Sequence, residues 1–301
     1  MIKSLDDIVA KARARGRKRL VVAYGQDSHT LEAVSDAVDM ELVDATLVGD
    51  PDRIKQVCDS DGLDIDKFEI IAETEDVKAV AKAVKMVSES QGDVLMKGLV
   101  STDKYMHGIL NKEYGLLPPK GVLSHVCVFE MPQLSKLLLV SDVAIIPYPD
   151  FAQKTKMLNY LINTARSLGI ERPKIACIAP SELLLPGLTS SVEASMLSKM
   201  GDRGQFGNAI IDGPLALDVA LFEETAKLKN VKGSSVAGDA DCLLFPNLDA
   251  ANVFFKSANH LCGGELAGIV VGTKVPCVLT SRGDSRRSKL SSIALGCILA
   301  K

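Results

Sequence analysis

The hydrophobic pattern of the first hundred residues alternates between two periods. Short and almost continuously apolar runs stand between segments whose apolar residues recur at helical spacing; the runs are LVVAYG, ATLVGD, FEIIAE and DVLMKG. Helices are predicted for residues 4–16, from about Ser28, from Asp50 and Pro51, and around residues 77–90. Apolar strands that alternate with helices are typical of a parallel sheet covered on both faces. The pattern predicts a doubly wound α/β fold.

The alternation is interrupted between residues 121 and 150, where GVLSHVCVFE and LLLVSDVAIIPYPD follow each other without a helix. A hairpin or a change of domain is expected there. The alternation then resumes with a helix over 150–168, the strand KIACIAP, a helix around 192–200, the strand NAIIDGP, a helix over 216–227 and the strand DCLLFPN. We predict a second α/β domain at about residues 131–270, inserted into a first domain formed by residues 1–130 and 271–301.

The composition is that of an ordinary soluble globular protein. The 301 residues carry a net charge of -3, with 47% apolar and 24% charged residues, a length that suits two domains sharing a cleft. No apolar run approaches the roughly 20 residues of a membrane span, and the N-terminus lacks an apolar signal core, so we expect no membrane association and a cytoplasmic location. A small acidic charge and 4% aromatic residues argue against nucleic acid as the partner.

Metal and redox sites are not indicated. The seven cysteines are scattered without C-x-x-C spacing and are predicted to be reduced core residues, and the four histidines show no ligand spacing. Two pairs of aspartates could in principle bind a divalent ion: Asp212 with Asp218, and Asp239 with Asp241. Aspartates so often cap helices or end strands that this simpler role is the better interpretation. G-x-G-x-x-G, the P-loop and G-x-S-x-G are all absent from the sequence.

Ligands of open α/β sheets bind beyond the carboxyl ends of the strands, so the loops that follow the strands are the candidates for chemistry. Four are rich in polar residues: YGQDSH, MKGLVSTDK, PYPD and TSRGDS. In the second, Lys97 and Gly98 precede a helix start at Ser101 or Thr102, a combination that suits an anion. An equally good interpretation is that Gly98 makes the turn and Ser101 only caps the helix.

The segment from Lys274 to Lys289 concentrates positive charge. Five cations, Lys274, Arg282, Arg286, Arg287 and Lys289, face one acid, Asp284, so the local charge is five minus one, or +4. The simplest interpretation is a solvated helix start with Gly283 in the turn. The dipole of a helix N-terminus disfavours cations unless an anion is also present, and arginine grips phosphate oxygens with two bonds. These arguments favour a phosphate or phosphorylated ligand.

Six motifs in one order over almost the whole chain resemble the phosphate acetyl/butyryl transferases, most closely the butyryl-transferring branch. They are DVLMKGLVST, GVLSHV, SDVAIIP, DGPLALD, AGDADCLLFPN and PCVLTSRGDS. The resemblance implies two α/β domains with a cleft between them, related to isocitrate and isopropylmalate dehydrogenases. It also implies that the inserted domain forms a homodimer.

The resemblance further implies a reaction that moves a short-chain acyl group between coenzyme A and inorganic phosphate, giving acyl phosphate and free coenzyme A. Bound phosphate attacks the thioester directly, so no tightly bound cofactor is expected. Ser281 and Arg282 match the Ser-Arg pair of the family, in which the arginine holds phosphate and the serine meets the thioester. The expected substrate-binding residues are Lys97, Gly98, Ser101, Thr102, His107, Ser124, His125 and Arg286.

The sequence departs from the acetyl-transferring relatives at three positions. His29 and His107 stand nearest to two of their arginines, and Ser288 stands where they carry an aspartate proposed as a base. Asp284 is the nearest carboxylate, and we hypothesise that it accepts the proton of phosphate.

Three alternatives remain open at this point. One is a phosphate acetyltransferase that uses mainly acetyl-CoA. Another is a decarboxylating dehydrogenase of similar architecture, which requires a divalent metal and a nicotinamide site, and neither is visible in the sequence. A third is a non-catalytic relative that binds coenzyme A or an acyl phosphate, which the two histidines favour and the intact Ser281-Arg282 pair disfavours.

Overall fold

The structure is a computed structural model and describes residues 2–281 and 283–301. The chain divides into two compact units. The split unit is formed by Leu5–Leu123 and Glu265–Lys301, and the inserted unit by Ser124–Gly264 with the few residues before Leu5. No helix in the described part of the chain is both long and apolar enough to cross a bilayer.

The split unit is built on a sheet with the strand order β3-β2-β1-β4-β11-β10. Five neighbouring strands run parallel, and β10 is antiparallel to β11, so the sheet is mixed. The strands are β1 (Lys18–Ala23), β2 (Val43–Gly49), β3 (Phe68–Ala72), β4 (Val94–Lys97), β10 (Glu265–Val271) and β11 (Cys277–Val278).

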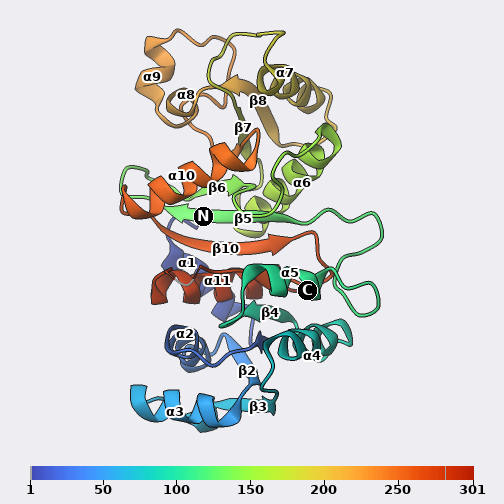
Figure 1. Ribbon diagram of the computed structural model, residues 1–301. Coiled ribbons are helices and arrows are strands. Elements are labelled where there is room, and N and C mark those ends of the chain that lie inside the picture. Colours follow the sequence, from blue (N-terminus) through green and yellow to red (C-terminus); the bar gives the residue numbers. More distant parts are fainter. Residues whose placement is uncertain (1, 282) are drawn as a thin grey trace. The chain divides into compact units, whose positions relative to one another are not determined.

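Helices cover both faces of this sheet. The chain steps from β1 to β2 to β3 in one direction and then returns to β4 on the other side of β1. Right-handed crossovers therefore place α2 and α3 on one face and α4 on the other. Accordingly α11 packs on α1 and α2, whereas α4 packs on α5 (Figure 1). The helices are α1 (Leu5–Ala14), α2 (Ser28–Asp39), α3 (Pro51–Asp61), α4 (Asp76–Ser88), α5 (Thr102–Ile109) and α11 (Arg286–Leu299), with a 3-10 turn at Ile65–Lys67.

Local sequence signals explain where these helices begin and end. Asp50 caps α3 by accepting from the N–H groups of Asp52 and Arg53, and Pro51 occupies the first turn. The helix stops at Gly62, whose φ of 67° is the left-handed conformation that glycine adopts without strain.

The inserted unit contains the strand order β5-β6-β9-β7-β8. β5 and β6 pair antiparallel, and the other neighbours are parallel. Its strands are β5 (Ser124–Glu130), β6 (Leu138–Ser141), β7 (Lys174–Ile178), β8 (Ile210–Leu215) and β9 (Cys242–Leu244). Its helices are α6 (Phe151–Ser167), α7 (Thr189–Asp202), α8 (Leu217–Leu221), α9 (Glu223–Leu228) and α10 (Leu248–His260).

The predicted α/β class is confirmed, but several elements differ from the sequence-based expectation. The helix predicted over 216–227 is two helices, because the backbone is extended at Phe222. The strand predicted over VPCVLT is paired only at Cys277–Val278. α10 and β10 were not expected from the sequence, and β10 makes the sheet mixed.

Candidate active site

Three loops of the split unit leave the same edge of the sheet. β1, β4 and β11 are parallel neighbours, with Ala23 opposite Lys97 and Met96 opposite Val278. Their carboxyl ends therefore lie side by side, and each is followed by a loop and a helix, α2, α5 and α11 respectively. The strand order reverses between β1 and β4, and the crevice at such a switch point is where open α/β sheets bind ligands.

The loops after β1 and β4 lie directly against each other. The N–H of Gly98 donates to the Ala23 carbonyl at 3.0 Å, and the N–H of Leu99 donates to the Tyr24 carbonyl at 2.9 Å. Gly98 is buried, and a side chain there would overlap the backbone of Tyr24 and Gly25. The glycine is therefore needed for close packing of two loops at the switch point.

Lys97 ends β4 with its ammonium directed into its own loop. The side chain is buried, and Nζ donates to the carbonyls of Gly98 at 3.1 Å and Val100 at 3.0 Å. Ser101 caps α5 by accepting from the N–H of Lys104 at 3.3 Å, and the exposed Thr102 is the first residue of the helix. The capping role considered for Ser101 is confirmed, and binding of an anion by this loop stays a prediction.

The turn after β11 is closed by three residues. The N–H of Ser281 donates to Asp284 Oδ2 at 2.6 Å, and the N–H of Asp284 donates to the Ser281 carbonyl at 3.2 Å. Lys289 Nζ donates to the carbonyls of Ser281 at 3.2 Å and Asp284 at 2.7 Å. Asp284 and Lys289 are buried, whereas Ser281 is exposed. Arg282 lies outside the described residues.

The charge argument for an external anion needs a correction at the start of α11. Arg286 binds both carboxylate oxygens of Asp36 on α2 through Nε and Nη2, and Arg287 Nη2 lies 3.1 Å from Asp6 Oδ1 on α1. Carboxylates of the fold therefore offset two of the cations that were taken to require a ligand. The role of Arg286 in substrate binding stays a prediction.

Burial also affects the charge of Lys289. Removal from water lowers the pKa of this lysine, and the nearby carboxylates of Asp284 and Asp27 act in the opposite direction. Asp27 belongs to the loop after β1, where its Oδ1 caps α2 by accepting from the N–H of Thr30 at 3.1 Å. Carboxylates of the loops that follow β1 and β11 thus both favour the charged form of Lys289.

His29 and His107 are both exposed on helices. His107 on α5 lies with Nε2 3.5 Å from Asp103 Oδ1, and His29 on α2 lies with Nδ1 3.9 Å from Glu32 Oε2. His107 also lines a groove of about 360 Å³ between α4 and α5, together with Lys104. Both side chains are open to solvent and to a ligand.

Ser124 and His125 belong to the inserted unit, where they open β5 as buried residues. The Ser124 hydroxyl lies 3.0 Å from the Ser141 hydroxyl and donates to Asp142 Oδ2 at 3.1 Å. It therefore links β5 to the end of β6. The other described candidates lie in the split unit, which brings seven of them to the strand end, loops and first helical residues at one edge of its sheet: Lys97, Gly98, Ser101, Thr102, Ser281, Asp284 and Arg286.

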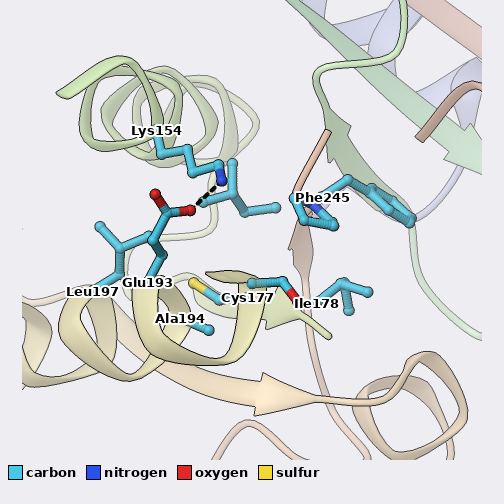
Figure 2. Close-up of a pocket in the computed structure, with 10 residues that line it drawn as sticks. Lys154, Cys177, Ile178, Glu193, Ala194, Leu197 and Phe245 are labelled. Atoms are coloured by element: carbon cyan, nitrogen blue, oxygen red, sulfur yellow. Dashed lines mark hydrogen bonds and ion pairs between the residues drawn. The ribbon is translucent and has the colours of Figure 1, made fainter. Parts of the chain in front are cut away.

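An ion pair between a buried lysine and a partly buried glutamate in the inserted unit was not predicted from the sequence. Lys154 Nζ binds Glu193 Oε2 beside a small pocket that Cys177 and Phe245 also line (Figure 2). Burial raises the pKa of the Cys177 thiol to about 12, so this cysteine is not a ready nucleophile. Lys154 is the fourth residue of α6, a position that its apolar neighbours mark as buried.

One of the two aspartate pairs considered as metal ligands, Asp239 with Asp241, has lysine partners. Lys136 Nζ lies 2.6 Å from both Asp239 Oδ1 and Asp241 Oδ1, and Lys174 Nζ lies 2.6 Å from Asp239 Oδ2. Within residues 2–281 and 283–301, no three His, Cys, Asp or Glu side chains are grouped as a metal site. The seven cysteines are free, and all are buried except Cys262.

The fold is that of an α/β protein with its candidate ligand site at the switch point of the split unit's sheet. A family model described as "Phosphate acetyl/butaryl transferase" matches residues 4–82 and 72–297. The chain belongs to this family.

Individual relatives cover nearly the whole chain. A phosphate butyryltransferase of Clostridium acetobutylicum is 44% identical over 300 residues, which is 100% of this chain and 99% of the relative. A phosphate acetyltransferase of Thermotoga maritima is 36% identical over 296 residues, 98% of this chain and 99% of the relative. The crystal structure of a branched-chain phosphotransacylase from Enterococcus faecalis superposes with a TM-score of 0.81 at 29% identity, covering 94% of this chain and 100% of that one.

Proposed function

We propose that this protein transfers a short-chain acyl group, butyryl or similar, between coenzyme A and inorganic phosphate. The proposal rests on family membership and on one structural observation. The parallel pairing of β4 with β11 brings the Lys97-Gly98 loop beside the turn that holds Ser281. A loop that suits an anion and a serine that suits a thioester thus leave the same sheet edge.

The proposed reaction needs positioning more than a covalent enzyme intermediate. We propose that Arg282 holds phosphate while an oxygen of the phosphate attacks the thioester carbonyl. The carbon–sulfur bond then breaks, and the thiolate of coenzyme A leaves near the Ser281 hydroxyl. Because both reactants are held at one turn, the reaction becomes effectively unimolecular instead of depending on a slow bimolecular encounter. A single hydrogen-bond donor to the developing oxyanion typically accelerates such a reaction by a further factor of about 10² to 10³.

The remaining substrate contacts are proposed from the family pattern and the placement of the residues. The α5 N-terminus with Ser101 and Thr102, and the backbone at Gly98, offer N–H groups to the phosphate. Lys97 orders this loop and adds positive charge. His107, which is exposed beside Lys104, is assigned to the phosphates of coenzyme A. Ser124, His125 and Arg286 complete the proposed binding residues.

Asp284 is proposed to accept the phosphate proton. One of its carboxylate oxygens already accepts the N–H of Ser281 at 2.6 Å, so the carboxylate also orients the turn. Taking a proton requires the ionised carboxylate, whereas orienting the turn requires only an oxygen that accepts the Ser281 N–H, so the two roles differ in how the rate depends on the protonation of phosphate.

At the level of the whole molecule, we propose that the two domains predicted from the sequence, residues 1–130 with 271–301 and residues 131–270, face a common cleft as in isocitrate dehydrogenase-like proteins. We also propose a cytoplasmic homodimer assembled through the inserted unit. Butyryl-CoA is preferred to acetyl-CoA as the proposed substrate because of the 44% identity to a butyryltransferase. Discrimination by one methylene is typically only about 10 to 200 fold, so acetyl-CoA is the alternative main substrate.

The test is release of the coenzyme A thiol from butyryl-CoA and acetyl-CoA, with and without inorganic phosphate, for the wild type and Arg282→Ala. We expect phosphate-dependent release that is faster with butyryl-CoA and that the variant loses. Folded protein that binds coenzyme A but releases no thiol would instead favour a non-catalytic relative.

A further inference from the structure

Lys289 is a buried cation that the proposed reaction does not yet use. It is the fourth residue of α11, and only 3% of the residue is exposed. Burying an ammonium group is costly unless its donors are satisfied. Its contacts therefore indicate what the fold gains from placing a lysine here.

Two of those contacts are hydrogen bonds to the two ends of a single turn. Nζ donates to the Ser281 carbonyl at 3.2 Å and to the Asp284 carbonyl at 2.7 Å. In the sequence these two residues enclose Arg282 and Gly283. The ammonium thus fixes the first and last residues of the segment that carries the Ser-Arg pair, and hydrogen bonds from a charged donor are stronger than neutral ones.

Other polar contacts join the described residues of this turn. The Asp284 carboxylate accepts the N–H of Ser281, and a Cβ atom added at Gly283 would meet nothing within 4 Å, so Gly283 itself is not closely packed. Contacts from Asp284 and Lys289 thus connect Ser281 to the start of α11. The same device recurs on the neighbouring loop, where the buried Lys97 donates to the carbonyls of Gly98 and Val100.

We propose that Lys289 is a positioning residue for the acyl transfer, which sets the place of Ser281 by holding the carbonyls of Ser281 and Asp284. This inference rests on the proposed function. Lys289 itself touches no reacting atom. It acts through the turn, and a displacement of about 1 Å in such a group can cost roughly 10² in rate.

The decisive variant is Lys289→Met, which keeps the length and apolar stem of the side chain but removes the donors. We expect kcat for phosphate-dependent release of coenzyme A to fall by about 10 to 100 fold. The KM for butyryl-CoA should stay within about twofold, because the contacts proposed for coenzyme A lie elsewhere. A residue that only stabilised the fold would change neither parameter at temperatures well below the Tm.

Lys154→Met provides the matched control. Lys154 is also the fourth residue of its helix and is 6% exposed, but its ammonium binds Glu193 in the inserted unit (Figure 2). We expect this variant to lose stability as well, since it leaves a partly buried carboxylate without its cation, while its kcat stays within about twofold of wild type.

A second variant covers the possibility that Lys289→Met does not fold. Lys289→Gln retains a donor for one of the two carbonyls, and we expect an intermediate loss of kcat with an unchanged KM for butyryl-CoA. Wild-type kcat in folded Lys289→Met, or in Lys289→Gln where Met fails to fold, would overturn the proposal, as would an equal loss of kcat in Lys154→Met. Failure of the wild type to release thiol would contradict the proposed function instead.

Discussion

The carbonyl oxygen of Tyr24 lies 2.4 Å from the position that a Cβ atom on Gly98 would occupy. Both atoms of this contact belong to backbone or to a fixed Cβ, so neither can swing away. Gly98→Ala must therefore separate the loops that follow β1 and β4. We expect a loss of about 1 to 3 kcal/mol in the free energy of unfolding, as for other overpacked sites. Phosphate-dependent release should fall at least about tenfold, because the Lys97 loop moves with Gly98.

Gly187→Ala is the control for this prediction. A Cβ atom at Gly187 would meet nothing within 4 Å, and its φ lies outside the range that disfavours a side chain. Chemical denaturation and steady-state kinetics should leave it indistinguishable from the wild type. Equal stability of the two alanine variants would contradict the structural role given to Gly98.

Asp284→Asn separates the two roles proposed for the aspartate. Asparagine retains an oxygen that can accept the Ser281 N–H, so the turn should persist, but a neutral amide cannot take a proton from phosphate. Below neutral pH more of the phosphate carries the proton that must be lost. The ratio of the variant's kcat to that of the wild type should therefore fall as the pH decreases from about 8 to about 6. A ratio of one throughout would leave Asp284 with the orienting role alone.

The sequence predicts the elements of this fold well where the determinants are local. Asp50 with Pro51 marks a helix start, and the apolar runs before Gly25 and Gly98 become β1 and β4. The alternation of strand and helix is enough for the α/β class. The pairing of β11 over only Cys277–Val278 depends instead on its neighbours, so the strand predicted from VPCVLT is too long.

The polar loops of the candidate site were predictable from the sequence, but the ion pairs of its charged side chains were not. The Lys97-Gly98 loop and the Ser281 turn are visible as polar stretches after strands. Asp36, in contrast, lies on α2 and meets Arg286 only because α11 packs on that helix. Charge counted along the chain therefore overstated the unpaired positive charge. The burial of Lys289 was hidden for the same reason, because the sequence shows a lysine in a cationic segment and not its enclosure.

The pair of Arg286 and Asp36 gives a direct test of the predicted role of this arginine in substrate binding. The guanidinium is half exposed and forms two bonds to the carboxylate. If the pair only fastens α11 to α2, Arg286→Gln and Asp36→Asn should lower the Tm by similar small amounts, as expected for an exposed ion pair. If Arg286 also binds phosphate, Arg286→Gln alone should raise the KM for phosphate, by about threefold or more. We expect the second result, because the first turn of α11 directly follows the Ser281 turn.

The lysine-aspartate cluster of Lys136, Lys174, Asp239 and Asp241 should contribute to stability without affecting activity. It lies at the amino ends of β6, β7 and β9, away from the strand ends that carry ligand sites in such sheets. Lys136→Met removes a cation shared by two carboxylates. Since Asp239 is more than half exposed, solvent screening limits the expected loss to about 1 kcal/mol at pH 7. Steady-state kcat should be unchanged.

The pH dependence of the stability lost in Lys136→Met identifies the origin of this loss. Burial raises the pKa of Asp239, but hydrogen bonds from Lys136 and Lys174 outweigh it, and the pKa lies below the ordinary value of 3.8. A carboxyl group with a depressed pKa stabilises the fold above its unfolded-state pKa, and this contribution disappears as the pH falls through the folded-state value. The difference in Tm between wild type and Lys136→Met should thus be constant from about pH 5 to pH 8 and shrink below about pH 4.

Lys199→Met, which breaks an exposed pair with Asp202 in the same unit, is the control and should show almost no difference in Tm from the wild type at any pH. A Tm difference for Lys136→Met that persists undiminished in acid would instead attribute the loss to packing of the lysine stem.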